Sequence, residues 1–108
     1  MNKTDKKNIE KYINNNIRKN YQTIKWSGNR NIIRIIKSTA LLNSDFQFTG
    51  KGDYHFGGLV EVYEKINLEN DVLSKIYTMN SNVHIDIDTE SGDIKITIKE
   101  PILLAERY

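Results

Sequence analysis

The sequence predicts an α+β protein in which an N-terminal amphipathic helix packs on a curved antiparallel sheet of about five or six strands, arranged as a hairpin meander. Apolar residues recur at helical spacing near the N-terminus, and they alternate with polar residues through most of the remaining chain. Short polar or glycine-containing stretches separate the alternating segments. At 108 residues, the chain is expected to form a single domain, 1–108.

The first predicted element is a helix over residues 4–20, with Thr4 as a suitable N-cap. Its apolar stripe consists of Ile9, Tyr12, Ile13 and Ile17. Its opposite side is a basic ridge, made of Lys7, Lys11 and Arg18. Because residues 14–16 are three asparagines, which are weak helix formers, the helix is expected to depend on docking its isoleucine face against the sheet.

Residues 21–37 are predicted to form two strands around a turn at 27–29, where Gly28 and Asn29 tolerate positive φ. The isoleucine pairs at 32, 33, 35 and 36 do not alternate strictly. A short helix running into residues 38–43 is therefore an alternative for this segment.

The next segment, residues 48–62, holds four of the six glycines of the chain. It lacks the phosphate-binding pattern GxxxxGK[ST], and it lacks a GxGxxG motif that opens a helix. Residues 51–53 are instead predicted to close a hairpin, and Gly57 and Gly58 to permit a bulge or a close backbone approach.

Two further hairpins are predicted. The first joins residues 59–66 to 72–79 through the polar connection 67–71, and one of its faces is expected to carry Val60, Val62, Ile66, Val72 and Ile76. The second has its loop at 89–92, which pairs Ile87 with Ile94, Ile85 with Ile96 and Val83 with Ile98. A slip of one residue would place isoleucine opposite lysine, so this register is strongly specified.

Pro101 is expected to end regular pairing, and residues 102–108 to fold back over an edge or the core. The predicted core comprises Ile32 or Ile33, Ile35 or Ile36, Phe46, Val60, Val62, Ile76, Val83, Ile85, Ile87, Ile94, Ile96 and Ile98, together with the helix stripe.

Several functional classes are disfavoured. The sequence has no run of 18 apolar residues and no apolar signal region, so an intracellular, cytoplasmic protein without a membrane partner is expected. The absence of cysteine removes disulfides and thiolate sites. His84, Asp86 and Asp88 share one strand face, but Lys95 and Thr97 lie opposite in the predicted register, so we interpret this face as a solvated surface with one ion pair and predict neither metal nor cofactor.

An enzyme would require His55 as a general base, oriented by Asp53 or Glu61, with Tyr63 as an acid. Nothing in the sequence brings these groups together. We therefore predict a protein that is not an enzyme, and a small enzyme centred on His55 is the third hypothesis.

Charge is distributed unequally along the chain. Residues 1–38 contain ten basic and two acidic residues, whereas residues 39–108 contain six basic and twelve acidic residues. This asymmetry predicts a charged partner, unless the two halves neutralise each other. The candidate binding residues are Lys7, Lys11, Arg18, Lys25, Trp26, Arg30 and Arg34.

The sequence therefore predicts a small non-enzymatic binding protein of the inhibitor, immunity or accessory-factor type. A protein partner is preferred, and nucleic-acid binding is the alternative. Asp53, Tyr54 and His55 are a candidate contact loop, and an exposed sheet edge would allow a homodimer. Asn, Ile and Lys, whose codons are AT-rich, make up 41 of the 108 residues, which is consistent with an AT-rich genome or a mobile element.

Overall fold

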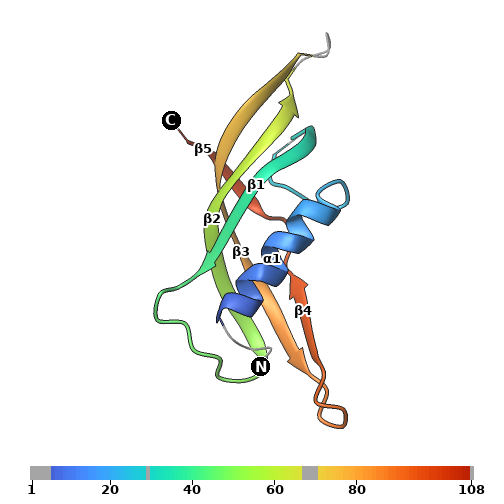
Figure 1. Ribbon diagram of the computed structural model, residues 1–108, viewed down its shortest axis with the longest axis vertical. Coiled ribbons are helices and arrows are strands. Elements are labelled where there is room, and N and C mark those ends of the chain that lie inside the picture. Colours follow the sequence, from blue (N-terminus) through green and yellow to red (C-terminus); the bar gives the residue numbers. More distant parts are fainter. Residues whose placement is uncertain (1–5, 29, 67–70, 108) are drawn as a thin grey trace.

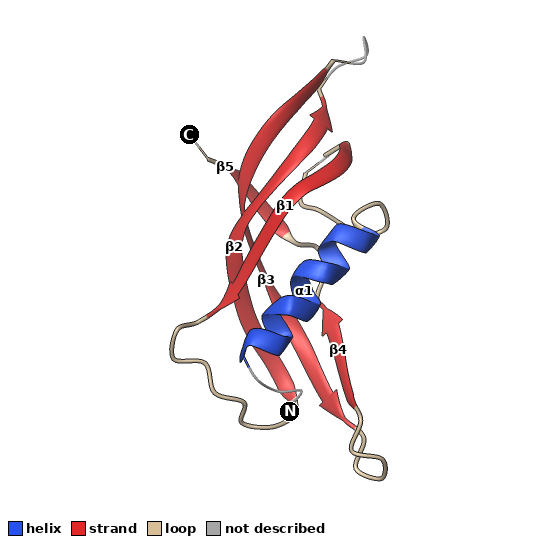
Figure 2. Ribbon diagram, in the orientation of Figure 1, coloured by secondary structure: helices blue, strands red, loops and turns tan. Residues whose placement is uncertain are grey.

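The computed structural model describes residues 6–28, 30–66 and 71–107. It contains one N-terminal helix, α1 (Lys6–Asn20), followed by β1 (Ile32–Leu42), β2 (Gly52–Lys65), β3 (Val72–Ile87), β4 (Ile94–Ile98) and β5 (Leu103–Glu106). The strands form a curled antiparallel sheet in the order β1-β2-β3-β4, and β5 also pairs with β3. Figures 1 and 2 show α1 lying on one face of this half-barrel, so the predicted α+β fold class is confirmed.

The helix docks through the predicted isoleucines. Ile9, Ile13 and Ile17 are fully buried, whereas Tyr12 is 39% exposed at the margin of the stripe. The predicted N-cap, Thr4, lies outside the described residues. Helix α1 packs mainly against β1 and touches β4 on its other side.

The structure contradicts the first of the two strands predicted over residues 21–37, whereas the second is present as part of β1. Residues 21–24 form turns and bends, and Trp26 makes only an isolated bridge to Ile102 near the C-terminus. Gly28 does adopt a positive φ of 75°, as a turn requires. The helical alternative for the isoleucine pairs is also wrong, because register shifts between Ile32 and Arg34 and between Ile35 and Lys37 break the alternation within strand β1.

The loop between β1 and β2 differs from the prediction at residues 51–53. Gly52 and Asp53 already belong to β2, and residues 43–51 make the connection. Gly58 provides the predicted close approach, because a Cβ at this position would lie 2.0 Å from the carbonyl oxygen of Thr39. Its φ of 148° also favours glycine.

The long β2–β3 hairpin is confirmed, but one of its predicted faces is wrong. Val60 pairs with Tyr77 and Val62 with Lys75, whereas Ile76 pairs with Glu61 on the opposite face. Residues that lie directly opposite each other in an antiparallel ladder share a face. Val72 and Ile76 therefore point away from the core and are 46% and 44% exposed.

Strands β4 and β5 follow each other along the second edge of β3. The predicted pairs Ile87–Ile94, Ile85–Ile96 and Val83–Ile98 are all present. After a break around Pro101, β5 pairs with residues 77–80 of β3, which confirms that the C-terminal segment folds back on a sheet edge. At the break, Ile102 turns inward and exchanges backbone hydrogen bonds with Lys25 and Ser27.

The core lies between α1 and the concave face of the sheet. It includes the predicted Val60, Val62, Val83 and Ile85, and it also includes residues that the prediction omitted, namely Ala40, Leu42, Phe56, Tyr77, Met79 and Ile102. The predicted core residues Phe46, Ile94, Ile96 and Ile98 are only partly buried. Ile76 is a surface residue, contrary to the prediction.

Candidate interaction surfaces

The solvent face of α1 carries a basic stripe, formed by Lys7, Lys11 and Arg18. All three side chains are exposed. Glu10 is turned sideways, where one carboxylate oxygen accepts a hydrogen bond from the backbone N–H of Leu42 and pairs with Lys6. Ion pairs between described residues, such as Lys51–Asp86 and Lys75–Glu106, do not involve the three cations of this stripe.

The other predicted basic residues do not join this stripe. The guanidinium of Arg34 lies 5.3 Å from the ring centroid of Tyr63 on the convex face. Arg30 reaches toward the concave side, where its guanidinium stacks 4.9 Å from the Tyr77 ring. Lys25 is exposed, and Trp26 is half-buried with its indole N–H donated to the carbonyl of Tyr21. The basic N-terminal third therefore forms several separate surfaces.

A polar cluster that the sequence pattern did not predict is buried on the concave side. Tyr77 is fully buried and donates its hydroxyl to Glu64 Oε1 at 2.5 Å, and Glu64 itself is 6% exposed. Arg30 donates to the same phenol oxygen at 3.4 Å. Burial raises the pKa of Tyr77, and the hydrogen bond to Glu64 raises it further. In the sequence, the one sign of this cluster is Glu64, an acidic residue at an inward-facing position of β2.

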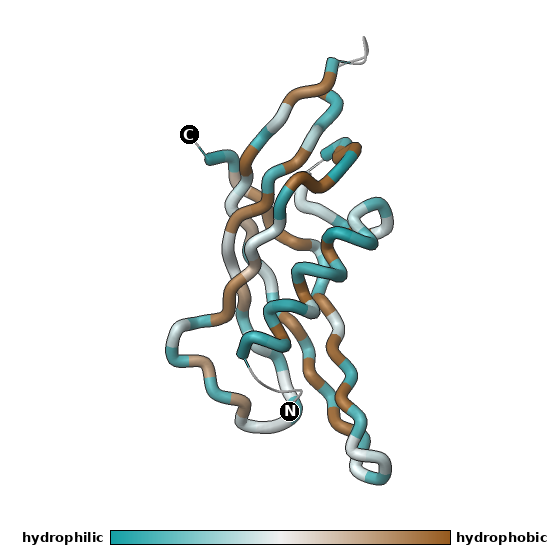
Figure 3. The backbone as a smooth tube through the Cα atoms, in the orientation of Figure 1, coloured by the Kyte–Doolittle hydropathy of each residue, from teal (hydrophilic) through white to brown (hydrophobic). Residues whose placement is uncertain are grey.

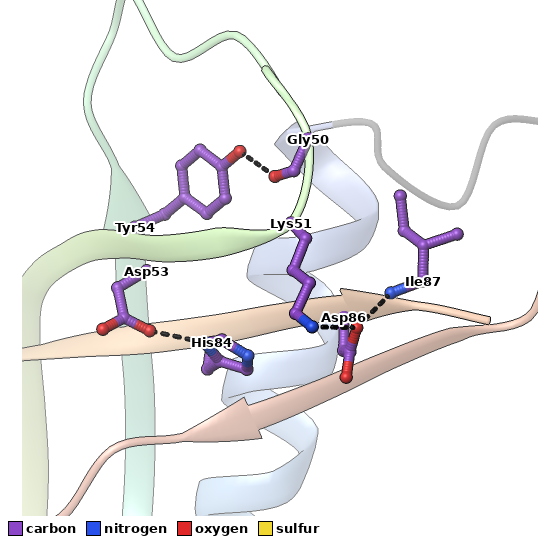
Figure 4. Close-up of polar contacts among 7 residues, drawn as sticks. All are labelled: Gly50, Lys51, Asp53, Tyr54, His84, Asp86 and Ile87. Carbon is purple, nitrogen blue, oxygen red and sulfur yellow. Dashed lines mark hydrogen bonds and ion pairs between the residues drawn. The ribbon is translucent and has the colours of Figure 1, made fainter. Parts of the chain in front are cut away.

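The predicted contact loop is divided between the two faces of β2. Asp53 lies on the convex face and contacts Nδ1 of His84 at 2.6 Å, as Figure 4 shows. Tyr54 points to the other side, packs between Phe46 and Phe48, and donates its hydroxyl to the carbonyl of Gly50. His55 is exposed opposite Asn82.

The grouping required for catalysis by His55 does not form. Glu61 is six residues farther along the same strand, a separation of roughly 20 Å. Asp53 is instead engaged with His84 from the neighbouring strand. Asp86, whose predicted partner was Lys95, makes an ion pair at 3.6 Å with Lys51 instead (Figure 4). Within residues 6–28, 30–66 and 71–107, the acidic and histidine side chains form no cluster that could hold a metal ion.

A groove of about 600 Å³ lies between α1 and β4. Its floor is apolar and includes the half-buried Ile94, Ile96 and Ile98. Its rim carries the amides of Asn16 and Asn20 from the helix. The groove exists because α1 lies closer to β1 than to β4, a relation between distant segments that the sequence pattern does not contain.

The β2–β3 hairpin forms a second exposed feature, which we call the arm and define as residues 61–66 and 71–76. In Figures 1 and 3 it extends beyond the end of α1 and carries hydrophobic stretches. Its exposed large apolar side chains are Tyr63, Ile66, Val72, Leu73 and Ile76. Such a concentration at one end of a protein is typical of a contact surface.

Comparisons of the chain with protein-family models, curated proteins and solved structures gave no significant match. Within the described part of the chain, no helix combines the length and the apolar character needed to cross a membrane.

Proposed function

We propose that the protein is a non-enzymatic binding protein that acts through a protein partner, in the manner of an inhibitor, an immunity protein or an accessory factor. The observation that carries the proposal is the open groove between α1 and β4. An extended segment of a partner would enter this groove and add a strand to the sheet, a common mode of peptide recognition.

Backbone hydrogen bonding at β4 supports strand addition. Lys99 donates its N–H to Asn82 of β3, so the backbone groups of Ile96 and Ile98, which alternate with those of Thr97 and Lys99, face away from β3. They face the groove, where no strand covers them among the described residues. A partner strand would satisfy these groups while its side chains cover the isoleucine floor.

The proposal is tested by capturing partners from an extract of the source cells with the 108-residue chain as bait. A bulky side chain in Asn16→Trp would fill the groove, and Ile96→Glu would place a charge on its floor. Either change is expected to abolish capture of a stoichiometric protein. Leu41→Glu, at a leucine that is 52% exposed on the convex face, is the matched control and should retain the partner.

Thermal unfolding of each variant separates loss of binding from loss of folding. If correctly folded Asn16→Trp and Ile96→Glu capture the partner as the original chain does, the groove is not the binding site. If no stoichiometric protein is captured, the protein-partner proposal itself fails.

Nucleic-acid binding is the second candidate, and the exposed stripe of Lys7, Lys11 and Arg18 favours it. Contacts between these cations and phosphates would make the affinity for duplex DNA or RNA fall steeply with salt. Changing all three residues to Glu is then expected to abolish binding while leaving capture through the groove intact. A duplex affinity that does not change with salt would exclude this candidate.

A further inference from the structure

The arm leaves part of a sheet edge uncovered. Strand β5 pairs with residues 77–80 of β3, and one last bond joins the N–H of Arg107 to the carbonyl of Ile76. Backbone groups of alternate residues point to the same edge of a strand, so those of Val72 and Ser74 face the same way as the carbonyl of Ile76. Within the described residues, this part of β3 is paired only with β2.

The space beside this edge is open. A groove of about 430 Å³ runs along it, lined by Ser74, Lys75 and Ile76 of β3, by Glu106 at the end of β5 and by Arg107 after it. Two side chains that flank the unpaired backbone, Val72 and Leu73, are 46% and 49% exposed. An exposed, apolar edge of this kind is a ready template for pairing with another strand.

We propose that the occupant of this edge is a second copy of the same chain, paired antiparallel to the first about a twofold axis at Leu73. Strand β3 of one copy then pairs directly with β3 of the other. In this register Leu73 faces the Leu73 of the second copy on the concave side, and Val72 faces Ser74 on the convex side. The backbone groups of Val72 and Ser74, which pair with no strand among the described residues, thereby form hydrogen bonds with the other copy.

Charge also favours this register. Counting outward from the axis, Asp71 of each copy lies opposite Lys75 of the other, and opposite charges on facing residues stabilise an antiparallel pair. Lys75 already pairs with Glu106 at 2.9 Å in its own chain. In the dimer its ammonium would therefore lie between two carboxylates, that of Glu106 and that of Asp71 of the second copy.

A register centred on Ser74 is disfavoured by the existing bonds. It would require Ile76 to pair with Val72 of the second copy, but the carbonyl of Ile76 already accepts the N–H of Arg107. With the axis at Leu73, the intermolecular backbone hydrogen bonds involve only Val72 and Ser74, and the bond between Ile76 and Arg107 is kept. The pairing is short, so a weak, concentration-dependent dimer is expected.

Because the chain contains no cysteine, single cysteines can test this register without interference. Facing residues in a non-hydrogen-bonded antiparallel pair have Cα atoms about 4.5 Å apart, which a disulfide can bridge. Leu73→Cys is therefore expected to form a covalent dimer under mild oxidation. Ile76→Cys should not, because two Ile76 positions would lie roughly 20 Å apart. Leu41→Cys is an equally exposed control on β1.

Light scattering on the 108-residue chain gives an independent readout. We expect the measured mass to rise from that of a monomer to that of a dimer as the protein concentration increases to about 1 mM. Leu73→Glu would place two like charges at the axis and weaken dimerisation by at least about tenfold. Leu41→Glu should have no effect.

A chain that stays monomeric over this range, with no Leu73→Cys cross-link, would overturn the proposal. Cross-linking that is faster at Ile76→Cys or Leu41→Cys than at Leu73→Cys would also overturn it, because the dimer would then use another surface. These outcomes are independent of partner capture by the groove between α1 and β4, which Leu73→Glu should leave unchanged.

Discussion

Tyr77 belongs to a buried polar cluster with Glu64 and Arg30 on the concave face. Its hydroxyl donates a hydrogen bond to Glu64 and accepts one from Arg30. The Nε of Arg30 is buried and has no partner among the described residues. Because a buried carboxylate is costly without a donor, Tyr77 and Glu64 stabilise the fold only as a pair.

This pair predicts a loss of stability at alkaline pH. The pKa of Tyr77 is raised in the folded protein, because burial and then the hydrogen bond to Glu64 favour the neutral phenol. The resulting stabilisation is fully present below the unfolded pKa of about 10, and it is lost as pH rises through the higher folded value. The free energy of unfolding, measured by urea titration, should therefore fall above pH 10.

Tyr77→Phe should remove this contribution. The variant is expected to be less stable at pH 7 by about 1–3 kcal/mol, because Glu64 loses its donor, and its stability should fall less steeply above pH 10. Lys75, whose pKa is raised mainly by its hydrogen bond to Glu106, contributes a remaining slope in the same pH range. Tyr63→Phe, at an exposed tyrosine of the same strand as Glu64, is the control. Equal slopes for the original chain and Tyr77→Phe would contradict the assignment.

At the scale of elements, α1 covers the free edge of β1 with its side chains. The amide oxygen of Asn14 accepts the backbone N–H of Ala40 at 2.7 Å and the hydroxyl of Ser38 at 2.8 Å. Its amide nitrogen donates to the carbonyl of Ala40 at 3.2 Å. Asn14 thus occupies the place of a neighbouring strand, which explains the use of a weak helix former at this position.

Asn14→Ala should therefore destabilise the protein although alanine favours helices. Ala40 would lose partners for both backbone groups, at a cost of about 1–3 kcal/mol, which exceeds the gain in helix propensity of up to about 0.7 kcal/mol. Asn15→Ala, one residue along the same helix and away from β1, should be neutral or stabilising. Urea unfolding measures both variants, and a neutral Asn14→Ala would show that water replaces the amide at this edge.

The elements that could be predicted from the sequence are those whose partners are close along the chain. The hairpin of β3 and β4 follows from matching isoleucines across one loop, and α1 follows from its own stripe. Residues 21–31 could not be predicted, because Trp26 finds its partner at Ile102, across most of the chain. In β3, both alternating sets of residues contain apolar side chains, so the pattern around Ile76 and Tyr77 did not identify the buried face.

Of the candidate surfaces, too, only the one that depends on local spacing could be predicted from the sequence. The basic stripe depends only on helical spacing, so Lys7, Lys11 and Arg18 were identified correctly as one exposed set. The groove depends on where α1 lies between β1 and β4, and the free edge of the arm depends on where β5 ends. Both are consequences of tertiary packing, which no local pattern records.

The whole molecule is elongated, with extents of 53 × 26 × 22 Å. The buried isoleucines of α1 lie over one part of the concave face, whereas the arm extends past the helix (Figure 1). Regions with few buried apolar contacts open locally, at a lower free energy than global unfolding. We therefore expect the arm and the helix-covered region to open separately.

Native-state hydrogen exchange of Ile13→Val tests this expectation at a protein concentration where the chain is monomeric. Removing one buried methylene should lower the global stability by about 0.5–1.5 kcal/mol, which accelerates exchange of core amides such as those of Val60 and Ile85 about 2- to 13-fold. The amides of Leu73 and Lys75, which point toward β2 in the arm, should exchange at unchanged rates because their opening does not require α1 to detach. Equal acceleration in the arm and the core would instead show that the half-barrel opens as one cooperative unit along its full length.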